Sequence, residues 1–174
     1  MTFETTGSRV EWEGRIAKVR VDTVRFDDGE EAEREVVEHP GAVAVIAHDG
    51  EKLFMVRQPR EPVGEQALLE LPAGKLDHEG EEVQATAARE LAEEIGKGAR
   101  TWEKLTTFYT TPGFADEEMH LYLATDLYDE QAEADENERI EIVEVPLEEL
   151  DDVIRDNRDS KTLVGLLWFR AYCR

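Results

Sequence analysis

The chain has 174 residues, which is enough for one domain with a proper core, with room for a small appendage, and too few for two ordinary domains. Apolar residues make up 40% of it in patterned runs, which excludes a disordered chain, and 42 acidic against 20 basic residues give a net charge of −22, which argues against nucleic acid and anionic membranes as partners. A single cysteine excludes an internal disulfide framework, and no apolar run could cross a bilayer, so we expect a cytoplasmic protein with no membrane partner.

The first part of the chain has the pattern of a small antiparallel sheet. Alternating apolar residues predict strands within Val10–Phe26, Asp27–Gly29 has the composition of a turn, and Ala32–Glu38 resumes the extended pattern. Such a sheet has little core of its own. The break at Pro40 predicts an N-terminal β subdomain of residues 1–39 and a main domain of residues 40–174.

The main domain opens with an apolar run, Ala42–Ala47, that is typical of a buried strand. The Asp49-Gly50 turn and the strand Leu53–Arg57 follow it, and together they predict a hairpin. The later elements alternate between extended and helical patterns, which predicts a mixed sheet sandwiched by helices and places the fold in the α/β class. These elements are strands near 68–71, 103–109, 119–125 and 140–145, and helices near 81–95, 147–155 and from 160 onward.

The helix near 81–95 has the clearest pattern of all the elements. Val83, Ala87, Leu91 and Ile95 recur every four residues and so lie on one face, and Gly96 is placed to end the helix.

Three carboxylates fall on another patch of this helix, because Glu93 and Glu94 lie one turn beyond Glu90. Like charges at this spacing destabilise a helix, whereas a divalent cation that takes several oxygen ligands would turn the repulsion into binding energy. A solvated acidic face is the plain alternative, and the helix alone leaves the two readings open.

The segment from Gly74 to Glu81, seven further residues, and Arg89-Glu-Leu-Ala-Glu-Glu-Ile-Gly96 resembles the Nudix box, the loop-helix-loop signature of the Nudix hydrolases. Six residues instead of the usual five separate Gly74 from Glu81, as in some ADP-ribose pyrophosphatases, and Lys97 replaces an aliphatic residue. The resemblance implies an α-β-α sandwich with a small N-terminal antiparallel sheet.

Four further segments are similar to the ADP-ribose pyrophosphatase branch of this family, and they extend the resemblance over nearly the whole chain. Pro112, sixteen residues after Gly96, matches the proline that marks the branch. The four segments are Val56–Arg60, Leu69–Gly74, Thr111–Gly113 and Ala134–Glu138.

The resemblance implies a metal site with about two or three Mg²⁺ ions, for which Mn²⁺ is a possible substitute. Gly74 and Glu81 would shape the box, and Arg89 would hold the helix carboxylates through ion pairs. The implied metal ligands are Glu90, Glu94, Glu138 and the carbonyl of Ala73.

The resemblance also implies the groups that act on the substrate. Glu136 would accept a proton from the attacking water, with Glu93 as the second catalytic candidate. Arg34 would reach the partner's site in a homodimer. The other substrate contacts would be Arg60, Gly113 and Glu117.

The predicted function is the metal-dependent hydrolysis of ADP-ribose to AMP and ribose 5-phosphate. Hydrolysis of another nucleoside diphosphate sugar, such as GDP-mannose, is the alternative within the same chemistry. A non-catalytic ligand-sensing Nudix domain and an acidic cation-buffering or interaction protein are alternatives of other classes. The complete set of Glu90, Glu93 and Glu94 argues against the sensor, and the placement of Arg89, Gly74 and Pro112 argues against the buffer.

Overall fold

The structure is a computed structural model that describes residues 2–15, 17–78, 80–132 and 139–173. It divides into two compact units. The first contains residues 1–41 and 109–118, and the second contains residues 42–108 and 119–174. Among the helices of the described residues, none is long and apolar enough to span a membrane.

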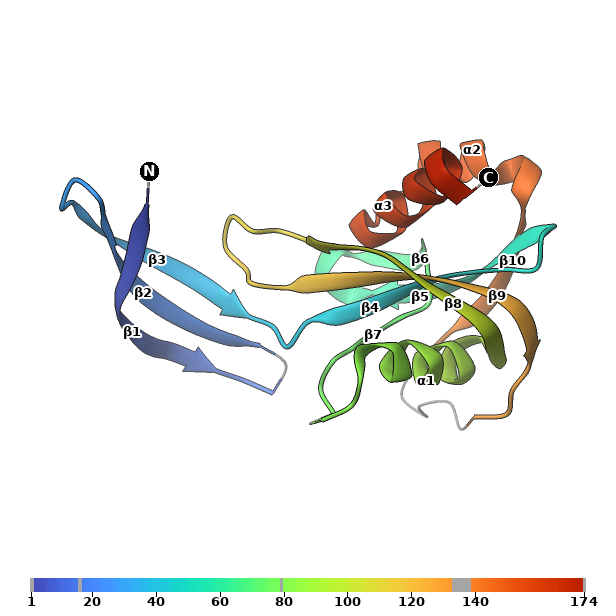
Figure 1. The fold of residues 1–174 in the computed structure, drawn as a ribbon, viewed down its shortest axis with the longest axis horizontal. Helices are drawn as coiled ribbons and strands as arrows, with labels where there is room; N and C mark the ends of the chain where they lie inside the picture. Colours follow the sequence, from blue (N-terminus) through green and yellow to red (C-terminus); the bar gives the residue numbers. More distant parts are fainter. Residues whose placement is uncertain (1, 16, 79, 133–138, 174) are drawn as a thin grey trace. The chain divides into compact units, whose positions relative to one another are not determined.

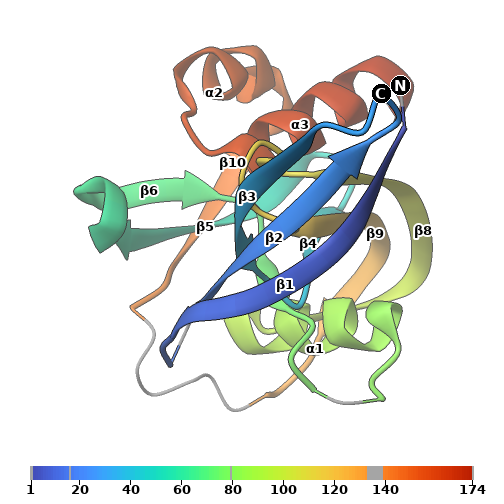
Figure 2. The same cartoon turned by 90° about the vertical axis from the view of Figure 1, so that its left-hand side faces the viewer.

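The first unit is built on a three-stranded antiparallel sheet in the order β1-β2-β3 (Figure 2). Every residue of β1 is exposed, and only Val21 and Val24 of the sheet's apolar residues are buried. The sheet therefore has little core of its own, as its sequence predicts. Its strands are β1 (Phe3–Glu13), β2 (Lys18–Phe26) and β3 (Glu31–Glu38).

The first strand begins seven residues before the expected Val10, because the polar stretch from Phe3 to Arg9 pairs with β2 through backbone groups that an apolar pattern does not reveal. The turn at residues 27–29 is present, with Gly29 at a φ of 87°.

The second unit is a seven-stranded mixed sheet covered by helices on both faces, which confirms the predicted fold class (Figure 1). The path through the sheet is β10-β5-β4-β9-β8, with β6 beside β5 and β7 beside β4. The strands are β4 (Ala42–His48), β5 (Lys52–Arg60), β6 (Glu65–Glu70), β7 (Ala73–Lys75), β8 (Lys97–Tyr109), β9 (Glu118–Asp129) and β10 (Glu141–Pro146). The helices are α1 (Val83–Ile95), α2 (Leu150–Asp156) and α3 (Ser160–Trp168), with 3-10 turns at Glu61–Val63 and Leu147–Glu149 and a π turn at Phe169–Cys173.

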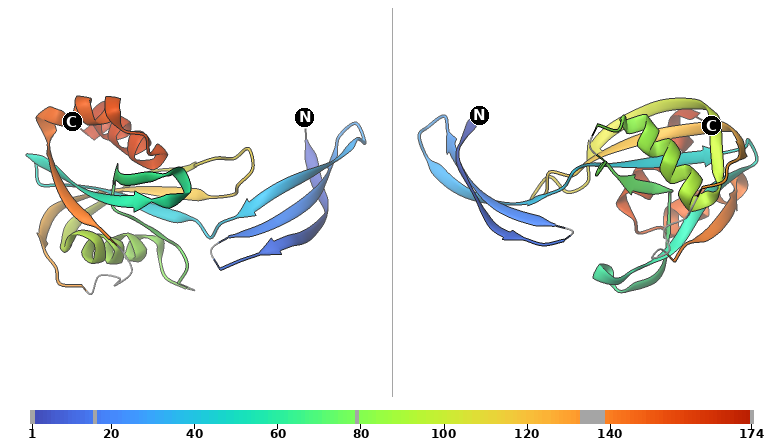
Figure 3. Two further views of the ribbon diagram at one scale, coloured as in Figure 1. Left: turned by 180° about the vertical axis from the view of Figure 1, so that it is seen from behind. Right: turned by 90° about the horizontal axis from the view of Figure 1, so that it is seen from below.

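Strand β4 is buried on both of its faces and separates two layers of core. Val43, Val45 and Ala47 pack in one cluster with Leu91 and Ile95 of α1. The alternate residues of β4 pack in a second cluster with Leu166 of α3, Phe169 and Leu150 of α2. Helix α1 therefore covers one face of the sheet, and α2 and α3 cover the other (Figure 3).

Helix α1 follows the predicted pattern closely but starts two residues late, at Val83. Ala87, Leu91 and Ile95 are buried, and Gly96 ends the helix in the left-handed conformation with a φ of 66°. Glu81 and Glu82 therefore precede the helix, with Glu82 at the N-cap.

The predicted hairpin of β4 and β5 exists, but its pairing is short. The two strands pair only at Ala47–Phe54 and His48–Leu53. The long partner of β4 is β9, which runs parallel to it over residues 42–47. Strand β4 is apolar because it lies inside a mixed sheet, where both of its faces are buried. Such a strand can pair with a strand that is distant in the sequence and does not need a hairpin partner along its whole length.

Candidate active site

The site forms where β4 and β5 separate. Beyond their short pairing, β5 pairs with β6 from Val56–Glu70 to Arg60–Glu65, and β4 pairs with β7 at residues 42–44. The chain crosses from β6 to β7 through Leu71 and Pro72, and the carbonyl of Pro72 accepts a hydrogen bond from the backbone N–H of Val45 at 2.9 Å. This crossing places Ala73 and Gly74, the first two residues of β7, against helix α1, and we call them the Ala73-Gly74 turn because the chain enters β7 there.

Three carboxylates gather around one guanidinium on α1. Nη1 of Arg89 lies 2.8 Å from Oε1 of Glu90 and 2.9 Å from Oε2 of Glu93, and Nη2 lies 3.3 Å from Oε2 of Glu81. The bonds from Arg89 and from the Thr86 hydroxyl lower the pKa of Glu81. The guanidinium of Arg89 thus holds three like charges together, two of which, Glu90 and Glu93, belong to the patch that the sequence predicts.

Glu94 joins the helix to the Ala73-Gly74 turn. Its side chain is 6% exposed, and its Oε2 accepts a hydrogen bond from the backbone N–H of Ala73 at 3.0 Å. Gly74 lies so close to the helix that a Cβ there would stand 1.9 Å from Cδ of Glu90. The turn is therefore a cradle for the Glu90 carboxylate that only a glycine leaves open.

The turn and the helix bring together two carboxylates and backbone oxygens, which are the kinds of donor that a divalent cation takes. Within the residues that the structure describes, no three His, Cys, Asp or Glu side chains form a group that could hold a metal ion. Glu90 and Glu93 bond to Arg89, and Glu94 bonds to Ala73. The remaining predicted ligand, Glu138, lies outside the described residues, as does the predicted base Glu136.

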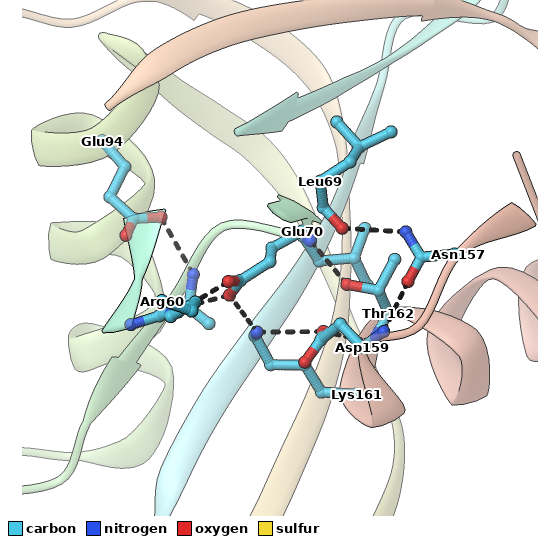
Figure 4. A network of polar contacts seen from close by, with 10 residues as sticks. Arg60, Leu69, Glu70, Glu94, Asn157, Asp159, Lys161 and Thr162 are labelled. Atoms are coloured by element: carbon cyan, nitrogen blue, oxygen red, sulfur yellow. Dashed lines mark hydrogen bonds and ion pairs between the residues drawn. The ribbon is translucent and has the colours of Figure 1, made fainter. Parts of the chain in front are cut away.

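Arg60 lies at the end of β5 and makes a two-pronged ion pair. Its Nε lies 2.6 Å from Oε1 of Glu70, and its Nη2 lies 2.7 Å from Oε2 (Figure 4). The hydrogen bonds that Arg60 donates to Glu70 raise the pKa of Arg60, burial opposes them, and the charges of Asp159 and Glu94 add to the rise. Of the carboxylates on α1, Glu94 is the one whose charge acts on Arg60.

The other three predicted substrate contacts belong to the first unit. Arg34 and Gly113 line one hollow of about 690 Å³ on this unit. The Nη1 of Arg34 donates to the Glu33 carbonyl at 2.8 Å, and its guanidinium stands 5.8 Å from the centre of the Phe26 ring. The structure thus brings Arg34 and Gly113 together.

Glu117 does not line that hollow and has its own partners. The Thr110 hydroxyl donates to its Oε2, and Nδ1 of His39 stands 3.6 Å from its Oε1. The neighbouring Asp116 ties the same loop to the sheet, because its Oδ2 lies 2.9 Å from Nη1 of Arg20 and its Oδ1 accepts the backbone N–H of His39 at 2.8 Å.

Sequence reasoning missed the residues behind Arg60. Glu70 is fully buried, and Lys161 of α3 is 8% exposed. Glu70 had one signal, since a charged residue stands between two leucines in a strand that leads into the core. Lys161 had none, because a lysine near the start of a helix in an acidic chain is ordinarily a surface residue.

Known proteins resemble this chain over most of its length. The family model of the NUDIX domain matches residues 37–164. The ADP-ribose pyrophosphatase of Bacillus subtilis (strain 168) is 43% identical over 162 residues, which cover 90% of this chain and 86% of that protein. The methanol dehydrogenase activator of Bacillus methanolicus is 44% identical with the same coverage.

A solved structure matches nearly the whole chain as well. The crystal structure of an ADP compounds hydrolase superimposes with a TM-score of 0.86 at 25% identity, covering 99% of this chain and 94% of that one. Because the domain model spans well over half of the chain and includes the Gly74 turn and the carboxylates of α1, the family predicted from the sequence is confirmed, and the chain belongs to the NUDIX domain family.

Proposed function

We propose that this protein hydrolyses the diphosphate bond of ADP-ribose and releases AMP and ribose 5-phosphate. The observation that carries the proposal is the cradle in which Gly74 leaves room for Glu90 while Glu94 bonds to Ala73. An acidic surface that merely stays solvated needs no such fit between a turn and a helix. The relatives named ADP-ribose pyrophosphatase and ADP compounds hydrolase support the substrate class.

The helix carboxylates serve a divalent cation in this proposal. Glu90, Glu94 and the carbonyl of Ala73 would hold it, Glu138 would complete the ligand set, and Mg²⁺ is the ion we expect, with about two or three in the site. When bound, it would neutralise charge on the diphosphate and orient the attacking water. Arg89 keeps the carboxylates gathered before the cation arrives, because it already bridges Glu90 and Glu93.

The chain itself supplies the remaining steps. Arg60 pairs with the negative charge of the diphosphate, since a guanidinium is suited to phosphate oxygens and the side chain of Arg60 is 42% exposed. Glu136 takes a proton from the water as it attacks phosphorus, and the bond from phosphorus to the leaving oxygen breaks. No covalent bond to the protein is needed. Glu93 is the second candidate for the base.

The first unit would complete the substrate site in a homodimer. Its sheet leaves Phe3, Val10 and Trp12 of β1 exposed at 69%, 52% and 56%, and exposed apolar side chains gathered on one strand are typical of a surface that a partner covers. A second copy of the chain would cover these side chains, and Arg34 would then contribute to the partner's site. Gly113 and Glu117 would contact the substrate from the loop of the same unit. We place this activity in the cytoplasm.

Hydrolysis of another nucleoside diphosphate sugar is the principal rival, because the cradle acts on the diphosphate and not on the base or sugar. Release of AMP from ADP-ribose with magnesium, and its loss with a chelator, tests the proposal directly. ADP-ribose should exceed GDP-mannose and dinucleoside polyphosphates in kcat/KM. Similar values for all three would favour the rival, and binding without product release would favour a sensor.

An Arg60→Ala variant tests the substrate contact. It should mainly raise KM, because a pairing with the diphosphate exists in the ground state as well as in the transition state. An unchanged KM would remove Arg60 from the substrate site.

A further inference from the structure

A buried carboxylate stands directly behind the arginine of the site. Glu70 is buried, and its two oxygens accept hydrogen bonds from Nε and Nη2 of Arg60 at 2.6 and 2.7 Å. The ammonium of Lys161 also bonds to Oε2 of Glu70 and lies 3.0 Å from Oδ2 of Asp159 (Figure 4). Four charged groups, from β5, β6, α3 and the N-cap of α3, therefore form one network.

The exposed fractions of the side chains show that this network runs from the interior of the protein to its surface. The side chain of Lys161 is 10% exposed and that of Glu70 is 1% exposed, whereas that of Arg60 is 42% exposed. Burying a lone carboxylate is costly, so the inner partner Lys161 offsets the charge of Glu70 from within the fold. Arg60 is left as the outer partner with one face open.

The ion pair with Glu70 also fixes the orientation of the Arg60 guanidinium. Glu70 occupies Nε and Nη2, and a guanidinium is planar, so the plane and the free Nη1 edge are set by the buried carboxylate. Among the contacts of the described residues, Nη1 has no hydrogen-bond partner. This edge is the one available to a phosphate oxygen.

Residues at the junction of α2 and α3 also form two hydrogen bonds to the backbone at and just after the end of β6. Nδ2 of Asn157 donates to the carbonyl of Leu69 at 2.8 Å, and the backbone N–H of Leu71 donates to Oγ1 of Thr162 at 2.9 Å. Asp159 caps α3 by accepting the N–H of Thr162 at 3.0 Å. The bonded segment, residues 69–71, leads directly into the Ala73-Gly74 turn, which bonds to Glu94.

We infer that Glu70 and Lys161 are positioning residues that set the orientation of Arg60 toward the diphosphate, an inference that rests on the proposed substrate contact of Arg60. Neither residue touches the substrate. Helix α3 lies outside the Nudix box, so the orientation of an active-site arginine is governed from the opposite face of the sheet to α1.

The test is a set of variants assayed for KM, kcat, the magnesium midpoint and the melting temperature. Glu70→Gln and Lys161→Met should each raise KM about tenfold, with kcat and the magnesium midpoint nearly unchanged, because Arg60 loses its fixed orientation while the helix carboxylates stay in place. Lys161→Arg keeps the charge and should restore most of the KM.

Arg158→Met is the matched control. Arg158 lies beside the same junction and pairs with Glu65 of β6 at 2.6 Å, but its side chain is 77% exposed, so its loss should leave KM unchanged. A rise in KM equal to that of Lys161→Met would overturn the inference.

Double variants with Arg60→Ala separate positioning from plain stability. If Glu70 acts through Arg60, adding Glu70→Gln to Arg60→Ala should raise KM by less than about twofold, whereas independent effects would multiply to about tenfold more. Full multiplication, or a fall in melting temperature with KM unchanged, would overturn the inference. If Glu70→Gln and Lys161→Met both fail to fold, the network serves the fold alone, and the inference is likewise overturned.

The proposed function can be refuted without refuting the inference about Glu70 and Lys161. The variants are assayed with whichever nucleoside diphosphate compound the wild-type protein hydrolyses with the highest kcat/KM. A preference for a substrate other than ADP-ribose would refute the substrate assignment, and the coupling between Glu70 and Arg60 would still be measured on that substrate.

Discussion

A single methyl group at Gly74 should disable the site without unfolding the protein. The Cβ of an alanine there would stand 1.9 Å from Cδ, 2.1 Å from Oε1 and 2.4 Å from Cγ of Glu90. Ordinary contact begins at 3.4 Å, so the carboxylate has to move by about 3.4 − 1.9 = 1.5 Å. The same movement breaks the 2.8 Å bond between Oε1 of Glu90 and Nη1 of Arg89.

The cost of Gly74→Ala should fall on activity and not on stability. Gly74 is not among the glycines with positive φ, so an alanine suits its backbone, and the group that must yield is the end of a flexible side chain. A displacement of about 1 Å at a reacting centre can cost about a hundredfold in rate, which is about 2.7 kcal/mol. We therefore expect kcat/KM to fall about a hundredfold and the magnesium midpoint to rise, with the melting temperature within a few degrees of the wild type.

The assay is AMP release as a function of magnesium concentration, beside thermal unfolding followed by circular dichroism. Gly7→Ala is the control, because its Cβ would lie 3.7 Å from the Thr23 hydroxyl, which is ordinary contact, and activity should be unchanged. Wild-type activity of Gly74→Ala at an unchanged magnesium midpoint would refute the role of the cradle.

The remaining predictions concern metal, base, assembly and acid stability. Glu90→Gln and Glu94→Gln should each raise the magnesium concentration for half-maximal activity, and excess magnesium should recover part of the turnover. Glu136→Gln should lower turnover by about a hundredfold to ten-thousandfold while calorimetry finds ADP-ribose affinity nearly intact, and near-normal turnover would remove it as the base. Sedimentation should find a dimer, and a fully active monomer would contradict the role of Arg34 in the partner's site. Because the pKa of Glu81 is lowered from 4.5, its ion pair stabilises the protein above pH 4.5 and is lost as the pH falls below that value. Urea titrations should accordingly find the gap between wild type and Glu81→Gln closing below pH 4.5, and a constant gap would contradict it.

Local patterns were sufficient to predict helix α1 and strand β4. The four-residue spacing in α1 and the apolar run of β4 each depend on neighbours within a few residues, so the sequence carries them directly. The partner of β4 was not accessible in this way. Its parallel pairing with β9 joins residues 42–47 to residues 119–124, and no turn or spacing signals that contact. The short β7 is defined only by its pairing with β4.

The residues of the candidate site likewise divide into those that a local sequence pattern predicts and those that depend on distant contacts. Glu90, Glu94, Arg89 and Gly74 lie in one continuous motif, and the structure brings them together as the motif implies. The support of Arg60 was not predictable, because Lys161 is 91 residues from Glu70 in the sequence. A contact of that separation depends on which face of the sheet α3 covers, and only the fold supplies it.

Because the chain is so acidic, its lysines and arginines say more about where a functional site lies than its carboxylates do. With 42 acidic residues, each carboxylate has solvation as an ordinary alternative, and composition alone favours that alternative. The 20 lysines and arginines are fewer, and a buried one has no such alternative, because it must find a negative partner inside the fold. Arg89 holds Glu90 and Glu93, and Lys161 holds Glu70. In a chain of this charge, a lysine or arginine that the structure shows to be wholly or partly buried is therefore the residue from which to begin the search for a site.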